Sequence, residues 1–516
     1  MNLASPSFIN PLIESNKPSK TADSCVMVIF GATGDLTARK LLPAIYNLAK
    51  EGLLPAHFAC VGFARRKKSH EEFRKEVKQA IDEFSRSKPI DQELWQRFSQ
   101  QIFYHQSEFD HDEGYESLGQ LLQKLDQQFG TKGNRVFYLS IQPSYFPLVA
   151  EKLSLHQLIE KPEPGQEKWS RVIIEKPFGR DLESAEKLQA KLLKFLDESQ
   201  IYRIDHYLGK ESVQNLLVFR FSNPIFEAIW NHHFIDNVQI TVSEEIGIGS
   251  RGNFWEEAGL LRDIMQNHVM QLLTLVAMEP PISLKATSIR DEKVKVLDCI
   301  RPIAENLLES QVVRGQYSAG YIQGNPVKSY REEDNVDPHS NIETFAAMKL
   351  FIDNWRWANV PFYIRAGKRL PKRATKIVIT FKKAPGYLFQ EASQLSSNVL
   401  VIRIQPDEGI SLKINCKVPA LNTAIQPVKM DFHYGSYFGS TPPEAYERLL
   451  CDCMAGDNTL FARDDEVLAS WKVFTPILHY WNAHPRRKCL PYTSGSWGPE
   501  AANELLTKDG RSWRLV

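Results

Sequence analysis

Four continuously apolar runs, separated by amphipathic stretches, most constrain the fold of the N-terminal part of the chain. The runs cover residues 25–30, 58–64, 135–141 and 171–175. Because polar and apolar residues do not alternate in them, they are typical of strands covered on both faces. Amphipathic segments at 71–84 and 115–129 have the spacing of helices. Strands alternating with helices predict a parallel, doubly wound sheet, and hence a Rossmann-like α/β domain.

The pattern changes from about residue 235, where strand-like segments follow one another with few helices between them. They cover residues 238–243, 376–382, 399–405, 410–416 and 428–433. Several alternate polar and apolar side chains, so we expect a large, mainly antiparallel sheet with one solvated face. Two long helices, 257–278 and 443–454, accompany it.

Three segments are therefore expected along the chain. Residues 1–24 are polar and lack the apolar core of a signal peptide, which predicts a flexible N-terminal arm. Residues 25–205 are expected to form the dinucleotide-binding, Rossmann-like domain, and residues 206–516 an α+β domain.

The overall charge and the cysteines exclude several classes of function. Lys and Arg number 63 against 62 Asp and Glu, so a net charge of +1 gives no reason to expect nucleic acid or an anionic membrane as a partner. The sequence contains no run of ~18 apolar residues, so we expect no transmembrane helix. The 7 cysteines form no CxxC pair, so we expect no metal site. We expect reduced thiols and a cytoplasmic location.

A glycine-rich turn directly follows the first apolar run. It reads Gly31-Ala32-Thr33-Gly34-Asp35-Leu36-Thr37. Glycines at such a turn let the backbone approach a pyrophosphate, which the N-terminus of the following helix favours. A glycine turn alone is a weak signal, but a buried strand before it and a helix after it strengthen the interpretation as a dinucleotide site.

The end of the second apolar run bears on the choice of coenzyme. NAD-binding sites usually place Asp or Glu there for the ribose 2′-hydroxyl. This chain has Ala64-Arg65-Arg66-Lys67-Lys68 instead. Arg65 could pair with a 2′-phosphate, with Lys40 as a second cation, so we expect NADP. The alternative is that the basic run is only a solvated start of a helix.

Two polar positions near apolar segments are catalytic candidates. Lys176 ends the fourth apolar run, where ligands of doubly wound sheets bind, although a plain surface turn remains an alternative. His268 lies on the apolar stripe of the helix expected at 257–278, where a buried structural histidine is the more frequent case. Polar neighbours, among them Asp263, nevertheless make His268 a candidate general base.

The stretch RIDHYLGKE at 203–211 concentrates charged and titratable side chains at the expected domain junction. If the chain turns helical after Asp205, His206 and Lys210 share one face, and Tyr207 adds a phenol. These groups suit an anion, and Asp205 is free to orient a base; a solvated loop is the alternative. A second basic cluster, residues 365–373, either faces solvent or closes over a phosphate.

Taken together, these motifs strongly resemble the glucose-6-phosphate dehydrogenase family. The matching stretches run in order over nearly the whole chain and include GATGDLTARKLLPA, EKPFGRDL, RIDHYLGKE, GLLRDIMQNH and VPFYIRAGKRL. The resemblance implies oxidation of D-glucose 6-phosphate at C1 to 6-phospho-D-glucono-1,5-lactone with NADP, the first step of the oxidative pentose phosphate pathway. It also implies a homodimer or homotetramer formed through the C-terminal sheet.

The resemblance also implies roles for individual residues. His268 corresponds to the general base, oriented by Asp205. Substrate-binding positions correspond to Lys176, His206, Tyr207, Lys210, Glu244, Asp263, Lys368 and Arg373. Coenzyme-binding positions correspond to Gly31, Thr33, Gly34, Asp35, Leu36, Lys40, Arg65 and Lys176. One departure from the family pattern is Asn253-Phe254-Trp255-Glu256, where Gly-Tyr-Tyr/Phe-Asp is usual.

Two other functions compete with this interpretation. A Rossmann-like dehydrogenase of an unphosphorylated sugar would also carry Glu-Lys-Pro after a strand, but it would not need the cations at 206, 210 and 373. A catalytically silent nucleotide-binding regulator would have lost the base or its carboxylate, and this chain has both His268 and Asp205.

Overall fold

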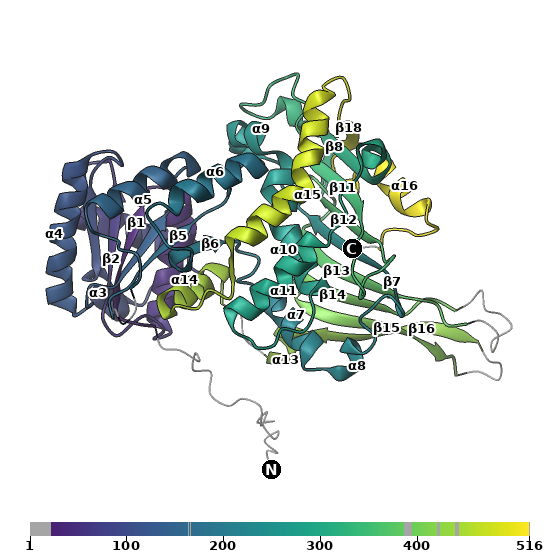
Figure 1. Ribbon diagram of the computed structural model, residues 1–516, viewed down its shortest axis with the longest axis horizontal. Helices are drawn as coiled ribbons and strands as arrows, with labels where there is room; N and C mark the ends of the chain where they lie inside the picture. Colours follow the sequence, from purple (N-terminus) through teal and green to yellow (C-terminus); the bar gives the residue numbers. More distant parts are fainter. Residues whose placement is uncertain are drawn as a thin grey trace, which may run out of the picture.

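Two large β-sheets, with helices between and around them, dominate the molecule (Figure 1). The computed structural model describes residues 22–163, 165, 167–385, 395–419, 424–438 and 443–514. Apart from residues 22–24, the arm predicted at 1–24 lies outside the described residues. The N-terminal sheet lies at the left of Figure 1 and the larger C-terminal sheet at the right.

The N-terminal sheet has the strand order of a Rossmann-like fold. Its parallel strands run in the order β3-β2-β1-β4-β5-β6. They are β1 (Cys25–Phe30), β2 (Phe58–Ala64), β3 (Ile102–Gln106), β4 (Arg135–Leu139), β5 (Ser170–Ile174) and β6 (Ile201–Ile204). All residues of β1, β2 and β4 are buried, which explains their continuously apolar sequences. The predicted doubly wound sheet is therefore confirmed.

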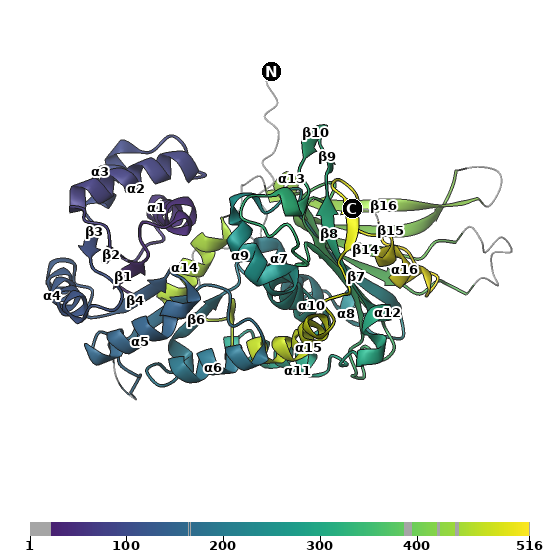
Figure 2. The same cartoon turned by 90° about the horizontal axis from the view of Figure 1, so that it is seen from above.

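Helices cover both faces of this sheet (Figure 2). One face carries α1 (Leu42–Lys50), α2 (His70–Phe84) and α3 (Gln92–Ser99). The other carries α4 (Asp112–Phe129), α5 (Phe146–Leu155) and α6 (Leu182–Leu192). The strand order reverses between β1 and β4, so a crevice opens at the carboxyl ends of these strands.

A late segment of the chain returns to this sheet. The short strand β17 (Phe461–Ala462) pairs antiparallel with β6, and α14 (Ala445–Ala455) packs against α1. Asn47 on α1 donates a hydrogen bond to the buried carboxylate of Glu447 on α14, at 2.8 Å. The boundary expected at 205/206 remains a prediction, and it leaves out this later contribution to the N-terminal sheet.

The C-terminal sheet is mixed and mainly antiparallel, as predicted. Its order is β16-β15-β14-β13-β7-β12-β11-β8-β18, and only β7–β12 and β8–β18 pair in parallel. The strands are β7 (Ile235–Ser243), β8 (Val312–Ser318), β11 (Phe345–Leu350), β12 (Phe362–Gly367), β13 (Ala374–Phe381), β14 (Val399–Gln405), β15 (Gly409–Lys417), β16 (Ile425–His433) and β18 (Leu490–Thr493). The sequence did not predict β8, β11, β12 or β18.

Several helices lie between the two sheets (Figure 2). They include α7 (Glu211–Phe221), α10 (Met270–Ala277), α11 (Ala286–Asp298) and α15 (Asp464–Ala483). Smaller elements are α8 (Pro224–Glu227), α12 (Leu308–Gln311), α13 (Tyr434–Phe438), α16 (Ala501–Thr507), β9 (Gly320–Ile322) and β10 (Asn325–Val327).

The single long helix predicted at 257–278 is wrong in detail. The chain forms α9 (Gly252–Leu260), the π-helix η5 (Leu261–Val269) and then α10. Gly259, next to the last residue of α9, interrupts the helical path just before η5, because its φ of 65° and ψ of 179° are not helical. Apolar spacing could not reveal this break, since both sides of it face the core.

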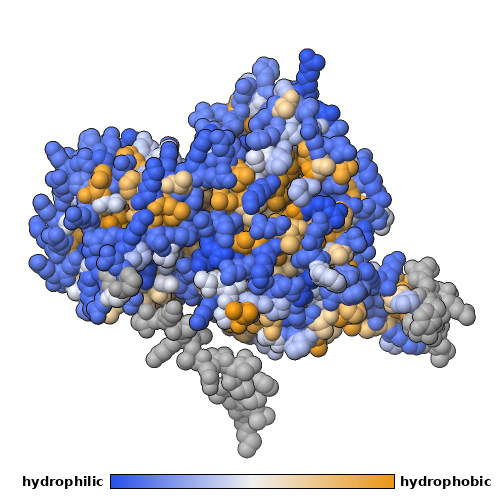
Figure 3. Space-filling model, in the orientation of Figure 1, coloured by the Kyte–Doolittle hydropathy of each residue, from blue (hydrophilic) through white to orange (hydrophobic). Residues whose placement is uncertain are grey.

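The surface is largely hydrophilic on the face shown in Figure 3, where hydrophobic residues appear in separate patches. Among the described residues, no helix combines the length and apolar character required to cross a membrane.

Candidate active site

The RIDHYLGKE stretch forms a turn between β6 and α7. Leu208 N–H donates to Asp205 O at 3.0 Å and Lys210 N–H donates to Tyr207 O at 3.1 Å, so the backbone makes two successive turns. The helix expected to begin after Asp205 begins only at Glu211, and Lys210 is its N-cap. That expectation was therefore wrong, and His206 and Lys210 do not share a helical face.

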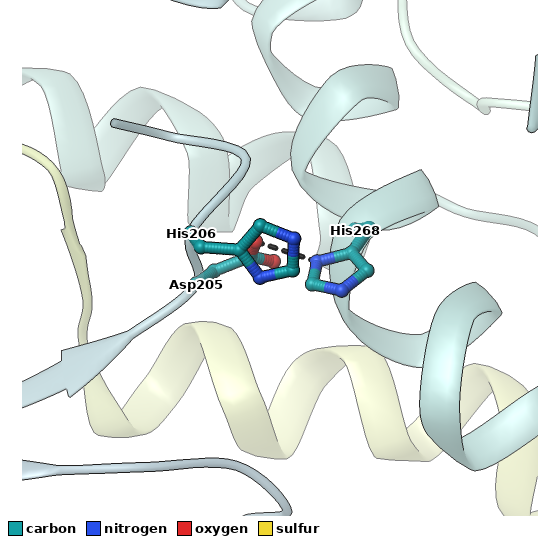
Figure 4. Close-up of side chains that lie close together, drawn as sticks. All are labelled: Asp205, His206 and His268. Carbon is teal, nitrogen blue, oxygen red and sulfur yellow. Dashed lines mark hydrogen bonds and ion pairs between the residues drawn. The ribbon is translucent and has the colours of Figure 1, made fainter. Parts of the chain in front are cut away.

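A buried carboxylate–imidazole pair lies at this turn. His268 Nδ1 and Asp205 Oδ1 are 2.6 Å apart, and their side chains are only 4% and 3% exposed. Tyr207 N–H also donates to the same oxygen, at 2.9 Å. In Figure 4, Asp205 and His206 come from the loop after β6, and His268 approaches from the facing helix. The proton on Nδ1 leaves Nε2 of His268 as the acceptor.

The surroundings favour the protonation states that a general base requires, a neutral imidazole and an ionised carboxylate. Burial lowers the pKa of His268 below its usual value, although the Asp205 carboxylate offsets part of the shift. Burial would raise the pKa of Asp205, but His268 and His206 outweigh this and lower it. A neutral imidazole beside an ionised carboxylate follows at neutral pH.

Lys176 reaches the opposite side of the imidazole. Its Nζ lies 3.1 Å from His268 Nε2 and donates to Asp263 at 2.9 Å (Oδ1) and 2.8 Å (backbone O). Burial alone would raise the pKa of Asp263, but Lys176 and Lys368 lower it, so this carboxylate is ionised. The ammonium group thus lies next to the atom that would accept a proton.

A cluster of cations lies on the far side of the RIDHYLGKE turn. Lys210 Nζ and Arg373 Nη2 both donate to Gln405 Oε1, at 2.6 Å and 3.3 Å. Tyr207 Oη lies 3.2 Å from Thr375 Oγ1. Burial, together with the charge of Arg373, lowers the pKa of Lys210 to about 8. In the described part of the chain neither cation has an ion pair, and two neighbouring cations on one amide oxygen favour an anion.

Gln405 and Thr375 were not singled out from the sequence. They face each other in the pairing of β13 with β14, and Gln405 Nε2 donates to Thr375 Oγ1 at 3.0 Å. Neither belongs to a recognisable motif, and only the strand register brings them together. Tyr446 was missed as well; its ring lies parallel to that of His206, with centroids 6.4 Å apart.

Glu244 and Lys368 form a third group at the ends of two paired strands. Gly367 on β12 is opposite Ser243 on β7, so the following residues meet and Lys368 Nζ forms an ion pair with Glu244. Lys368 is 1% exposed, with Nζ 4.7 Å above the ring of Trp255. The basic cluster predicted at 365–373 is therefore divided, because Arg365 points elsewhere and donates to Thr241 Oγ1 at 3.1 Å.

The glycine turn has the geometry that a phosphate cradle requires. Gly31 has a φ of +79°, and a Cβ there would lie 2.1 Å from Ser140 O. Gly34 N–H donates to Gly31 O at 2.9 Å, and Thr37 Oγ1 donates to the same oxygen at 3.2 Å. Thr33, Asp35 and Leu36 lie within this turn and the start of the next helix. The backbone conformation of Gly31 and its close approach to Ser140 therefore require a glycine, and they produce the tight turn expected of a dinucleotide site.

Arg65 and Lys40 lie in different surroundings. Arg65 is exposed directly after β2, and Gly31 N–H donates to Phe63 O at 3.0 Å, so Arg65 lies at the edge that carries the glycine turn. Lys40 instead pairs with Glu444 at 2.9 Å and is one of the charges that act on Lys210. The expectation that Lys40 lies beside the 2′-phosphate as a second cation stays a prediction.

A cavity of about 700 Å³ opens next to Lys176. Pro143 and Lys176, which follow β4 and β5, line one side, and Phe254 and Ala258 of α9 line the other. Asp263, which Lys176 contacts, lines it as well. A volume at the carboxyl ends of these strands fits the nicotinamide end of a dinucleotide.

The same carboxylate and imidazoles could also hold a metal ion. Ligand atoms of Asp205, His206 and His268 lie within 4.8 Å of one another. The hydrogen bond between Asp205 and His268 already accounts for this spacing, and the ammonium of Lys176 opposes a second positive charge there.

A Rossmann-like sheet with a phosphate-cradling turn, joined at a cavity to a buried imidazole and a lysine, defines an oxidoreductase that uses a nicotinamide dinucleotide. Residues 28–215 match the family model described as the glucose-6-phosphate dehydrogenase NAD binding domain. Residues 217–514 match the C-terminal domain of the same enzyme. The chain belongs to the glucose-6-phosphate dehydrogenase family, whose coenzyme is NADP, and the resemblance seen in the motifs is confirmed.

Individual relatives cover nearly the whole chain. Glucose-6-phosphate 1-dehydrogenase of Chlamydia muridarum is 56% identical over 495 residues, which cover 95% of this chain and 96% of the relative. The enzyme of the same name from Aggregatibacter actinomycetemcomitans is 46% identical over 96% of this chain and 98% of its own length. A solved structure of glucose-6-phosphate dehydrogenase in complex with its substrate glucose-6-phosphate has a TM-score of 0.87 and 37% identity, over 97% of this chain and 100% of that one.

Proposed function

We propose that the protein oxidises the C1 hydroxyl of D-glucose 6-phosphate with NADP, giving 6-phospho-D-glucono-1,5-lactone at the start of the oxidative pentose phosphate pathway. The observation that carries the proposal is one turn that serves two sites. Asp205 bonds to the imidazole of His268, and Lys210 of the same turn belongs to the cation cluster. A substrate with an oxidisable hydroxyl at one end and a phosphate at the other suits this arrangement.

In the proposed reaction, Nε2 of neutral His268 accepts the proton of the C1 hydroxyl as the C1–O bond becomes a carbonyl. Asp205 holds the proton on Nδ1 and stabilises the imidazolium that forms. Bound NADP supplies the acceptor for the hydride that leaves C1. Lys176 moves from Nε2 of His268 to the substrate oxygen and also contacts the coenzyme.

The remaining polar groups bind and orient the sugar phosphate. His206, Tyr207, Lys210 and Arg373 hold the phosphate; in the ligand-free protein Lys210 and Arg373 share Gln405 as a partner. Two carboxylates and one lysine on the opposite wall accept from and donate to the sugar hydroxyls; these are Glu244, Asp263 and Lys368.

The coenzyme assignment depends on the glycine turn and on Arg65. Gly31, Thr33, Gly34, Asp35 and Leu36 are proposed to contact the pyrophosphate and its ribose. Arg65 is proposed to pair with the 2′-phosphate, because no carboxylate ends β2 to accept from a free 2′-hydroxyl. Lys40, in the helix that follows the glycine turn, is proposed as a second cation near the same 2′-phosphate.

We also propose a homodimer or homotetramer formed through the C-terminal sheet, in the cytoplasm. The edge strand β16 is largely exposed, with Val428 at 42% and Met430 at 58%. All 7 cysteines are free thiols, which fits a reducing compartment. Sedimentation of the unchanged protein and of Met430→Glu tests the interface; a monomer in both cases contradicts it.

An absorbance assay of the reduced nicotinamide tests the proposed reaction. The purified protein is incubated with glucose 6-phosphate or glucose, and with NADP or NAD. Turnover is expected with glucose 6-phosphate and NADP. No turnover with either coenzyme refutes the function, whereas equal turnover of glucose favours a dehydrogenase of unphosphorylated sugars. Equal efficiency with NAD refutes the role of Arg65.

A further inference from the structure

The buried carboxylate of Glu343 lies outside the proposed substrate and coenzyme contacts, yet it holds the start of the helix that carries the base. Glu343 is 3% exposed and directly precedes Thr344 and β11. Leu261 N–H donates to its Oε1 at 3.0 Å. Leu260 N–H and Trp255 Nε1–H donate to its backbone oxygen at 3.2 Å and 3.3 Å. Side chain and backbone of one residue therefore satisfy three donors where α9 meets η5.

The backbone at the connection between α9 and η5 requires a glycine, and the carboxylate of Glu343 lies directly against it. Gly259 has a φ of 65° and a ψ of 179°, a backbone region that essentially only glycine adopts. A Cβ at Gly259 would lie 2.5 Å from Glu343 Oε1. The first turn of η5 has N–H groups without helical partners, and a carboxylate is favoured at that end of a helix. Glu343 supplies this carboxylate from the segment before β11.

The helix held in this way carries both a substrate carboxylate and the base. Asp263 lies in the first turn of η5 and His268 in its last. Asp263 contacts Lys176 at 2.9 Å, and His268 contacts Asp205 at 2.6 Å. A shift at the start of η5 would therefore displace both groups from their partners in the N-terminal half.

The residue after Glu343 fixes the opposite wall of the same site. Lys368 N–H donates to Thr344 O at 3.0 Å, which ties the lysine to the start of β11. Trp255, whose indole donates to Glu343, also lies beneath the ammonium of Lys368. Two consecutive residues thus connect η5 with the lysine that faces it.

We propose that Glu343 is a positioning residue for the oxidation reaction: its carboxylate anchors the first turn of η5 and so sets where His268 and Asp263 stand relative to Lys176 and Lys368. The inference rests on the proposed function. Among the described residues Glu343 has no ion-pair partner, and its side chain accepts a hydrogen bond from the backbone N–H of Leu261. Burial raises the pKa of Glu343, which Leu261 N–H and the charges of Arg262 and Arg314 only partly oppose.

Glu343→Ala, which removes the side-chain acceptor, tests this role. In a protein that folds and binds NADP normally, kcat with glucose 6-phosphate is expected to fall about 100-fold, because displacing a catalytic group by 1 Å costs about that much. KM for NADP is expected to change much less than kcat, since the glycine turn and Arg65, which are proposed to hold the pyrophosphate and the 2′-phosphate, lie on the N-terminal sheet. Glu343→Gln keeps an oxygen for Leu261 N–H and is expected to restore most of kcat.

Glu256→Ala is the matched control. Glu256 is a carboxylate on α9, on the other side of Gly259, and accepts a hydrogen bond from Ser340 at 2.7 Å. Its loss should lower thermal stability while kcat stays near that of the unchanged protein. A folded Glu343→Ala protein with normal kcat overturns the proposal, as does an equal loss of kcat in both variants. If Glu343→Ala does not fold, Glu343→Met, which keeps the volume, replaces it under the same criteria.

A readout independent of turnover separates this inference from the proposed reaction. The titration of His268 can be followed by NMR of selectively labelled histidine, with the signal assigned from His268→Asn. The pKa of His268 is expected to move in Glu343→Ala and not in Glu256→Ala. If the unchanged protein does not oxidise glucose 6-phosphate, the proposed function fails, but an altered titration still supports the positioning role. An unaltered titration in Glu343→Ala refutes it.

Discussion

His268 and Asp205 lie 63 positions apart in the sequence, and their side chains meet at 2.6 Å in the buried space between the two sheets. The second carboxylate oxygen, Asp205 Oδ2, is buried and without a hydrogen-bond partner among the described residues. The carboxylate thus interacts with one imidazole nitrogen and one backbone N–H, both through Oδ1. Such a pair fixes both the tautomer and the direction of the imidazole.

Asp205→Asn tests whether the carboxylate of Asp205 assists His268. The amide keeps the shape and can still accept from Tyr207 N–H, but it no longer stabilises an imidazolium. We expect kcat to fall by about 100-fold or more, with a smaller change in KM for glucose 6-phosphate. Steady-state kinetics measure both constants. Normal kcat in a folded variant would show that Asp205 does not assist the base.

The pKa of Lys210 predicts an alkaline limit to substrate capture. In the free protein this pKa is lowered to about 8, so Lys210 loses its proton and its attraction for phosphate as the pH rises through that value. Because kcat/KM reports the free enzyme, it should decline above about pH 8, whereas kcat should not, since bound phosphate keeps the ammonium charged.

Arg373→Gln serves as the control for this pH dependence. Removing the neighbouring charge raises the pKa of Lys210, so the alkaline decline of kcat/KM should move to higher pH although KM increases. A decline that stays at the same pH in this variant would assign it to another group.

Arg65→Gln should separate the two coenzymes. If Arg65 pairs with the 2′-phosphate, its loss removes a charge-assisted hydrogen bond and raises KM for NADP about 10-fold or more, while KM for NAD hardly changes. Arg66→Gln, at the next exposed position, is the control and should leave both constants near their original values. Equal losses with both coenzymes in Arg65→Gln would contradict the assignment.

A buried ion pair between α11 and α15 should contribute to the stability of the fold and not to catalysis. Lys293 and Glu466 are 1% and 0% exposed and 2.6 Å apart. Lys293→Met leaves a buried carboxylate without its cation, which should lower the free energy of unfolding by about 3 to 5 kcal/mol. Lys295→Met on the same helix breaks a pair whose lysine is 67% exposed, and should cost under about 1 kcal/mol. Thermal unfolding followed by circular dichroism compares the two.

The sequence predicted the N-terminal sheet better than the C-terminal one, for a physical reason. Strands β1, β2 and β4 are covered on both faces, so their apolar composition is sufficient to recognise them. In the C-terminal sheet, β18 has only one buried residue, and its place is set by pairing with β8. Register between distant segments carries no local signal, so β18 could not be predicted; β11 and β12 are largely buried and were missed although their composition resembles that of the recognised strands.

The same distinction holds within the site. Residues on compact motifs, such as Lys176, Asp205 and His268, could be named from the sequence. Gln405 could not, because its importance comes from the pairing of β14 with β13. The break at Gly259 also escaped prediction, since a glycine within an apolar helical pattern is more often tolerated than structural.

The return of α14 and β17 to the N-terminal sheet has a consequence for biosynthesis. Once residues 1–205 have left the ribosome, all parallel strands of the N-terminal sheet have been synthesised. The edge of β6 nevertheless stays unpaired until Phe461 and Ala462 emerge. Until then Arg86 and Asn47 also lack the carboxylate of Glu447. The half of the molecule that is synthesised first is therefore among the last to be completed, and a chain truncated at residue 205 would expose an unpaired strand edge prone to association.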